Sequence, residues 1–250
     1  MMHIFENDKI SIAVNSLGSE LFSLKSKKDG REYIWQGEPA IWARRSPNLF
    51  PQCGDFPEGY AYGGKQYFLP QHGFLRDIEA EVRGNSFFFS SSSKTKEIYP
   101  FDFTVEIQFT LTGASVEQRF LITNQSNCPL PYSAGFHTGL AGKWVTLAWE
   151  GRTISLDSSY LTDVRKFFDL DCYSFVLSDE YGKKIRLESK DYTTIVLWSA
   201  KGGAEKFVCL EPRIDTDAHR EVGPFERIIP PGGMHEFFQR ITMDYTTGTC

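Results

Sequence analysis

The sequence predicts an all-β protein with little helix, folded as an antiparallel sandwich or barrel. Aromatic residues make up 15% of its 250 residues, including 21 Phe and 11 Tyr, and such residues are enriched in strands. Apolar and polar side chains alternate with period two in most ordered segments, and no stretch shows a helical stripe over three turns. Turn signals recur roughly every 8–12 residues, which is typical of antiparallel all-β folds.

The predicted strands begin with a hairpin formed by residues 9–15 and 20–26, followed by a short strand at 32–35. Residues 41–67 lose periodicity and gather Pro and Gly, which predicts a long loop, and such loops are often functional. The clearest strand is 101–111, where apolar side chains alternate with polar ones. Further strands are predicted at 116–124, 144–149, 184–188, 193–198, 206–210 and 234–243. No linker or repeat is visible, so residues 1–250 are predicted to form one domain.

Charge and cysteine usage exclude several classes of partner. The net charge of −5 gives no electrostatic footprint for nucleic acid or an anionic membrane. The five cysteines form no CxxC pair, which argues against a disulfide framework or a zinc ribbon and favours reduced thiols in the cytoplasm. No signal sequence and no apolar run of membrane-spanning length is present, so we expect neither export nor a transmembrane helix.

Two of the five histidines are candidates for chemistry. His3 and His235 are interpreted as structural or solvated, and His219 lies in a charged segment typical of a surface. His72 directly precedes Gly73, and His137 lies two residues from Gly135 and Gly139; both are in predicted loops, where a ligand can reach them. Alone, each of these signals is also compatible with an ordinary hydrogen-bonded histidine.

Glu211 is the candidate carboxylate. It follows the apolar run 207–210 and precedes Pro212, which predicts that a buried strand ends here with the carboxylate at the rim of the core. A glutamate in that position needs a cationic partner, and Arg213 is close enough in sequence to supply one.

Arg44 and Arg45 precede an otherwise apolar loop, residues 46–51. A guanidinium presents several fixed donors, so either could bind a sugar hydroxyl or a phosphate. The alternative is a pair of solvated charges.

Four motifs in order resemble the aldose 1-epimerase (galactose mutarotase) family, and within it a short bacterial branch associated with lactose-utilisation genes. They are residues 42–51 (Trp-Ala-Arg-Arg-Ser-Pro-Asn-Leu-Phe-Pro), 71–77 (Gln-His-Gly-Phe-Leu-Arg-Asp), 135–138 (Gly-Phe-His-Thr) and 209–212 (Cys-Leu-Glu-Pro). Residues 17–24 and 32–37 also resemble the first strands of that branch. The likeness therefore spans essentially the whole chain.

The resemblance implies a large antiparallel β-sandwich with a sugar cleft on one sheet. It also implies cofactor-free, metal-free interconversion of the α and β anomers of an aldohexose. By this resemblance Glu211 takes the proton from the C1 hydroxyl and His137 protonates the ring oxygen. His72 hydrogen-bonds the sugar and helps to stabilise charge during ring opening.

The resemblance also suggests residues that hold the sugar. Arg44 matches the family's arginine best, with Arg45 as its competitor, and Asp171 resembles a sugar-binding aspartate that precedes a strand. Trp198 is an expected stacking surface, together with Trp42 and Trp144. After Glu-Pro the branch usually has Trp and Gly, whereas this chain has Arg213 and Ile214, so one wall of the cleft is expected to differ.

General acid/base chemistry fits these roles, since ring opening removes one proton from O1 and delivers one to O5. A free histidine titrates near ~6.5 and a free glutamate near ~4.3. The neighbouring carboxylate is expected to raise the pKa of His137 and keep it protonated. Activity should then fall at acid pH as Glu211 is protonated and at alkaline pH as His137 is deprotonated.

Other functions remain open on the sequence alone. One is a hexose-6-phosphate mutarotase, which two cleft-facing arginines would favour; with Arg44 alone in the cleft a neutral hexose is favoured. A second is a non-catalytic carbohydrate-binding protein on the same fold. A third is a metal site formed by His72, His137 and Glu211, which the absence of a short His-x-His spacing disfavours. The sequence makes no prediction of oligomeric state.

Overall fold

The protein is described by a computed structural model over residues 1–161, 164–168, 172–215 and 224–244. Strands make up about 53% of the structure and helices about 5%, which confirms the predicted all-β class. The short helices are a 3-10 turn at Leu75–Asp77, α1 (Ser93–Lys96) and α2 (Ser158–Leu161). Across these ranges no helix has the length and apolar character needed to cross a membrane.

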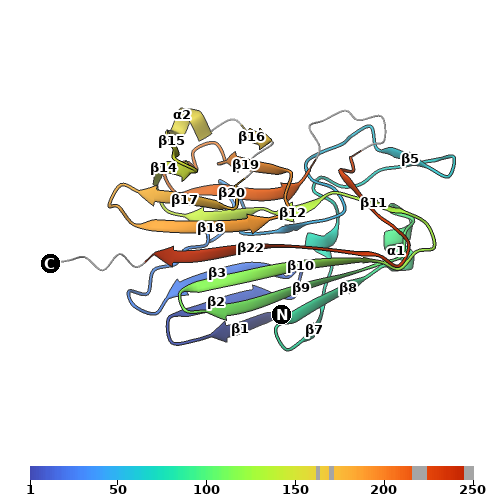
Figure 1. Ribbon diagram of the computed structural model, residues 1–250, viewed down its shortest axis with the longest axis horizontal. Helices are drawn as coiled ribbons and strands as arrows, with labels where there is room; N and C mark the ends of the chain where they lie inside the picture. The colour runs from blue at the N-terminus through green and yellow to red at the C-terminus, as the bar shows by residue number, and fades with distance from the viewer. Residues whose placement is uncertain (162–163, 169–171, 216–223, 245–250) are drawn as a thin grey trace.

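The largest sheet is antiparallel and has nine strands, whose long members lie side by side across the molecule (Figure 1). In spatial order they are β15 (Arg152–Ser155), β14 (Trp144–Trp149), β17 (Ser174–Asp179), β18 (Lys184–Lys190), β22 (Met234–Asp244), β10 (Ser115–Asn124), β9 (Phe103–Thr112), β8 (Ser86–Ser90) and β7 (Glu81–Arg83). Burial alternates strictly along β10. The period-two pattern of the sequence therefore reports one buried and one solvated face.

A second antiparallel sheet has six strands and holds most of the motifs singled out above. Its members are β16 (Arg165–Phe168), β19 (Thr194–Trp198), β20 (Phe207–Ile214), β12 (Ala134–Phe136) and β4 (Asn48–Leu49), with β13 (Thr138–Ala141) also paired to β20. The smaller sheets are β1 (Met2–Glu6), β2 (Ile10–Asn15) and β3 (Glu20–Ser26); β11 (Leu130–Tyr132) with β21 (Arg227–Ile229); and β5 (Tyr60–Tyr62) with β6 (Lys65–Tyr67).

Aromatic side chains join the two large sheets. Phe120 of β10 stacks on Phe237 of β22 with ring centroids 4.8 Å apart. Phe136 of β12 packs against Phe237 at 5.3 Å. All three are buried members of one hydrophobic cluster that includes residues from 10 to 243. Burial of such rings supplies much of the driving force for sheet packing.

A buried polar network also crosses between the sheets, beneath the segment that contains His137. Gln118 donates to Asn48 at 2.6 Å, and Gln239 donates to Gln118 at 2.9 Å and to Thr138 at 2.9 Å. Buried amides that satisfy one another add geometric specificity to a core. The network fixes β4, β10, β13 and β22 relative to one another, and Gln118, an exception in the apolar pattern of its strand, is explained by it.

Several predicted boundaries differ from the structure. Residues 32–35 make only single bridges, from Glu32 to Lys25 and from Ile34 to Leu140, so they form no strand. The predicted loop 41–67 contains β4, β5 and β6. β20 does not end at Glu211 but continues to Ile214, because Pro212 is tolerated where one neighbouring strand is interrupted.

Candidate active site

The candidate site lies on one face of the six-stranded sheet, along β20 and its neighbours. Val196 of β19 pairs with Glu211, and Lys166 of β16 pairs with Val196. Residues paired across antiparallel strands present their side chains on the same face. These three side chains therefore form a row, with Glu211 in the interior of the sheet and Lys166 at its edge. Glu211 is fully buried rather than at the rim of the core.

The other neighbour of β20 is interrupted opposite Pro212. β12 ends at Phe136 and β13 begins at Thr138, with His137 between them. Pro212 has no N–H to donate to this neighbouring strand, and the N–H of His137 donates on the β4 side, to the carbonyl of Pro47 at 3.0 Å. The pairs on either side of the interruption share one register. His137 therefore extends the same row and lies opposite Glu211.

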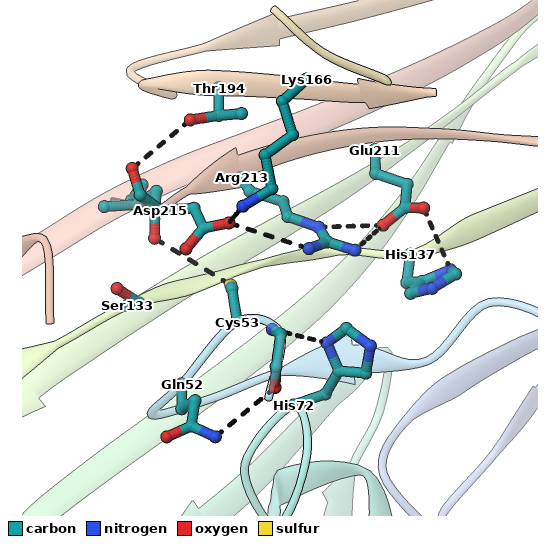
Figure 2. Close-up of polar contacts among 12 residues, drawn as sticks. Gln52, Cys53, His72, Ser133, His137, Lys166, Thr194, Glu211, Arg213 and Asp215 are labelled. Carbon is teal, nitrogen blue, oxygen red and sulfur yellow. Dashed lines mark hydrogen bonds and ion pairs between the residues drawn. The ribbon is translucent and has the colours of Figure 1, made fainter. Parts of the chain in front are cut away.

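His137 and Glu211 form a buried pair. Nδ1 of His137 lies 3.5 Å from Oε1 of Glu211, as Figure 2 shows. Within the described part of the chain neither atom has a hydrogen-bond partner. Buried polar atoms are nearly always satisfied in native proteins, and exceptions call for an explanation. Two such atoms facing each other are what a proton donor and a proton acceptor for a bound ligand require.

Arg213 holds the other oxygen of Glu211. Its Nε donates to Oε2 at 2.9 Å, and its Nη2 also donates to Oε2. The charge chain continues outward, since Nη1 of Arg213 lies 3.8 Å from Asp215 and Nζ of Lys166 lies 3.4 Å from the same carboxylate (Figure 2). Anchoring Oε2 in this way leaves Oε1 directed at His137.

The glycines of the Gly-Phe-His-Thr-Gly stretch provide space for these side chains. A Cβ on Gly135 would lie 2.9 Å from Cα and Cγ of Arg213, and a Cβ on Gly139 would lie 2.9 Å from the ring of Trp42. Both positions therefore exclude larger residues. The first lets Arg213 lie flat along the sheet, and the second lets Trp42 stack on His137, with ring centroids 4.9 Å apart.

His72 approaches the pair from a loop. Its φ is 64°, and the following Gly73 packs so tightly that a Cβ would lie 2.1 Å from the carbonyl oxygen of Phe50. Nδ1 of His72 accepts from the N–H of Gly54 at 2.9 Å. A neutral imidazole that accepts at Nδ1 carries its proton on Nε2, so His72 offers an N–H donor. Its ring lies perpendicular to that of His137, 5.3 Å away.

Burial controls the protonation of these groups. Burial raises the pKa of Glu211 to about 7, against the opposing effect of Arg213. Burial, followed by Arg213 and His72, holds the pKa of His137 well below its usual range. Burial and the nearby Arg213 lower the pKa of His72 to about 2. The expectation that Glu211 raises the pKa of His137 is thus wrong, because burial and the guanidinium oppose the carboxylate.

Two tryptophans wall the site. Trp42 stacks on His137, and Trp198 meets the same imidazole edge-on at 5.7 Å. The cavity between the tryptophans, the pair and the His72 loop has a volume of about 540 Å³, within the range of small-molecule pockets. It is lined by Trp42, Gly54, Gln71, His72, Arg76, His137, Val164, Lys166, Val196, Trp198, Glu211 and Arg213.

Comparison with known proteins identifies the family of the chain. A family model described as aldose 1-epimerase matches residues 1–194. The chain belongs to the aldose 1-epimerase family. The chain is 28% identical over 257 residues to the curated protein LacX (chromosomal) of Lactococcus lactis subsp. lactis. The alignment covers 83% of this chain and 85% of LacX.

Solved structures confirm the fold of this aldose 1-epimerase family member. A galactose mutarotase-like protein from Lactobacillus casei ATCC 334 superposes with a TM-score of 0.90 at 21% identity, covering 98% of this chain and all of that one. A galactose mutarotase related enzyme from Lactobacillus acidophilus gives 0.89 at 23% identity, covering 99% of each chain. The predicted galactose mutarotase-like β-sandwich is therefore confirmed.

Several predicted sugar-binding residues of this aldose 1-epimerase family member lie elsewhere. Neither Arg44 nor Arg45 lines the cavity. Arg44 donates to Asp77 at 2.7 Å, and Arg45 stacks over Phe22 with its guanidinium carbon 4.0 Å from the ring centroid. Trp198 does line the cavity. Asp171 lies outside the described residues.

Trp144, the other expected stacking residue, is a buried core side chain whose Nε1 donates to the carbonyl of Leu140 at 3.0 Å. Among the residues that line the cavity and were missed as ligand-binding candidates, two are basic, Arg76 and Lys166. Arg76 stands in the same short motif as His72, which was the available signal. Lys166 belongs to an edge strand that had not been predicted, so nothing in the sequence pointed to it.

A metal is a chemical alternative at the candidate site. The donor atoms of His137, Cys209 and Glu211 lie within 4.8 Å of one another. The set differs from the predicted one, because it contains Cys209 and not His72. Nδ1 of His72 accepts a hydrogen bond from the N–H of Gly54. Arg213 places a positive charge directly on Glu211, which opposes a dication at the same carboxylate. The donor set therefore fits a proton-transfer pair better than a metal.

Proposed function

We propose that the protein is a mutarotase, which interconverts the α and β anomers of an aldohexose by ring opening and reclosure. The observation that supports this most is the His137–Glu211 pair, whose facing atoms are buried and unpartnered. Mutarotation needs one acceptor for the O1 proton and one donor for O5. Because O1 and O5 are both bonded to C1, the acceptor and the donor must be neighbours.

The pair is suited to holding a single proton. Before a sugar binds, the raised pKa of Glu211 and the lowered pKa of His137 favour the proton on Glu211. A bound sugar changes this balance, since the O1 hydroxyl donates to the carboxylate and O5 accepts from a protonated imidazole. Hydrogen bonds to the charged forms favour those forms. Substrate binding therefore prepares Glu211 as the base and His137 as the acid.

Ring opening then balances in protons. Glu211 takes the O1 proton, His137 gives its proton to O5, and the C1–O5 bond breaks to leave an open-chain aldehyde. Rotation about C1–C2 presents the opposite face of the carbonyl. Reclosure returns the O5 proton to His137 and the proton on Glu211 to O1, so the enzyme ends in its starting state.

Other cavity residues have supporting roles in this proposal. The Nε2–H of His72 donates to a sugar oxygen during opening. Trp42 and Trp198 provide apolar surface for a sugar face. Arg213 is a positioning residue, because it holds one oxygen of Glu211 and limits how far burial raises the pKa of that carboxyl.

Anomer exchange of freshly dissolved α-hexose, followed by NMR or polarimetry, tests the proposal. We expect catalysis above the spontaneous rate by the wild-type protein. If instead sugars bind without any acceleration of exchange, the protein is a carbohydrate-binding module on a mutarotase fold.

A further inference from the structure

Four charged side chains of alternating sign run from the reactive pair to the edge of the six-stranded sheet. Glu211, Arg213 and Asp215 occupy alternate positions at the end of β20 and just beyond it, and alternate residues of a strand project from one face. All three side chains are at most 5% exposed. Lys166 of β16 completes this charge series, with its Nζ 3.4 Å from Oδ2 of Asp215 (Figure 2).

The stability of the fold does not explain the charge series. Taking charges out of water costs free energy that their mutual attraction repays only with very good geometry. Replacing a buried ion pair by apolar residues is therefore often neutral or stabilising. The series begins at Glu211, the proposed base, so its effect on that carboxylate is the place to look for a role.

Asp215 lies at the outer end of the Arg213 guanidinium. Nε and Nη2 of Arg213 donate to Oε2 of Glu211, and Nη1 lies 3.8 Å from Oδ2 of Asp215. The backbone of Asp215 is fixed in turn, because its N–H donates to Oγ1 of Thr193 at 2.9 Å and its carbonyl accepts from Oγ1 of Thr194 at 3.4 Å. A rigid, planar guanidinium between two carboxylates is oriented from both ends.

The charge series also controls the electrostatics at Glu211. Burial raises the pKa of Glu211 to about 7, Arg213 lowers it, Asp215 raises it and Lys166 lowers it. The signs follow the order of the charges, since Asp215 offsets Arg213 and Lys166 offsets Asp215. A group that exchanges protons at neutral pH works best with a pKa near 7.

The other titratable groups that border the series are uncharged at neutral pH before a sugar binds. His137 faces Oε1 of Glu211, and burial holds its pKa well below its usual range. Sγ of Cys209 lies within 4.8 Å of the donor atoms of His137 and Glu211, and Sγ of Cys53 lies 4.0 Å from the carbonyl that precedes Asp215. Burial raises the pKa of both thiols well above its ordinary value.

We propose that Asp215 and Lys166 are positioning residues for the His137–Glu211 pair and act on it through Arg213. Asp215 aligns the guanidinium and offsets its charge, so that Glu211 can hold the shared proton at neutral pH, and Lys166 limits this offset. The inference rests on the proposed mutarotase function for its effect on rate. The protonation of Glu211 can be measured without turnover.

The test is the titration of the Glu211 carboxyl, followed by carbon-13 NMR without sugar, with Glu211→Gln to identify its signal. Carboxylates four residues apart on a strand are ~13 Å apart, so Asp215→Asn should move the midpoint to lower pH by about one pH unit. Lys166→Gln should move it to higher pH by about 0.3 pH units, because a side chain that is 36% exposed is screened by solvent. The alkaline limb of kcat/KM should follow both shifts.

The opposite directions separate charge from packing. A loosened core that admits water would lower the pKa of the buried Glu211 in either variant, whereas loss of a nearby cation raises it. Asp215→Glu keeps the negative charge and should return the midpoint toward the wild-type value. Lys166 lies at the sheet edge, so Lys166→Gln tests the inference even if Asp215→Asn fails to fold.

Two controls match these variants away from the site. Asp179→Asn changes a buried carboxylate that lies 3.1 Å from Arg31, and Lys183→Gln changes a lysine that lies 3.4 Å from Asp29. Both should leave the Glu211 midpoint at the wild-type pH.

Both shifts in the stated directions support the inference. A midpoint that either variant leaves unchanged or moves the other way overturns it. If both shifts occur but wild-type protein does not accelerate anomer exchange, the positioning role stands and the mutarotase function is rejected. Acceleration with unmoved midpoints gives the reverse result.

Discussion

Nδ1 of His137 lies 3.5 Å from Oε1 of Glu211, and both side chains are buried on one face of the six-stranded sheet. The contact joins residues 74 positions apart in sequence, through the pairing of β20 with the β12–β13 segment. The following expectations derive from the proposed transfer of protons between this pair and a bound sugar.

Glu211→Gln should lower kcat for anomer exchange by about 10²–10⁴-fold, because the amide keeps the volume of the side chain but cannot accept the O1 proton. Sugar affinity should stay within a few-fold of wild type, since the variant removes chemistry rather than contact surface. The control Glu97→Gln changes an exposed glutamate at the end of α1 and should have wild-type kinetics. Near wild-type turnover by Glu211→Gln would make the carboxylate structural.

The pH profile of kcat/KM should fall above about pH 7. The active form of the pair holds one proton, and burial raises the pKa of Glu211 to about 7 while it holds that of His137 well below its usual range. Raising the pH through 7 removes the single proton, and the acid limb lies well below pH 6.5, where a second proton binds. These limbs belong to the pair as a whole. A profile that is flat from pH 6 to 9 would contradict the shared-proton model.

Arg213→Met should move the alkaline limb to higher pH, because the guanidinium lowers the pKa of Glu211 against burial. It should also reduce kcat, since Oε2 loses two hydrogen bonds. Stability is linked to the same shift. In the variant the pKa of Glu211 rises further above its unfolded value, so the loss of stability should be larger at pH 8 than at pH 6.

Thermal unfolding at the two pH values and the pH profile of exchange measure both effects of Arg213→Met. Arg213→Lys keeps the positive charge but lacks the two-donor geometry of a guanidinium. Compared with Arg213→Met, it should bring the alkaline limb part of the way back toward the wild-type pH and recover a smaller part of the lost kcat. An unshifted limb in Arg213→Met would show that Arg213 only packs.

The strands were predictable where one face is buried and the other solvated. β9 and β10 alternate along their length, and the alternation alone places them. β20 was different, because every one of its residues is buried. Because burial does not alternate along β20, Pro212 was the only residue that suggested where the strand ends. Its effect fell on the neighbouring strand, which breaks at His137, rather than on β20.

The sequence predicted which proposed catalytic side chains lie together, and it predicted the residues that line the cavity around them less well. His72, His137 and Glu211 stand in motifs whose order resembles a family, and the structure brings them together. Arg44 and Arg45 differ because their placement depends on a tertiary contact, an ion pair with Asp77 in one case and the ring of Phe22 in the other. No local pattern records such contacts. The raised pKa of Glu211 and the lowered pKa of His137 likewise depend on burial, which only the folded chain defines.

His72→Asn should raise KM and lower kcat, each by up to about tenfold, while the melting temperature stays near that of wild type. Asparagine tolerates the positive φ of this position, and its short side chain can still accept from the N–H of Gly54. It cannot extend a donor into the cavity, as Nε2 of His72 does. His72→Asn should therefore change the kinetics without changing the melting temperature. The control His3→Asn on β1 should change neither. A large drop in melting temperature together with unchanged kcat in the folded fraction would assign His72 to loop structure instead of substrate contact.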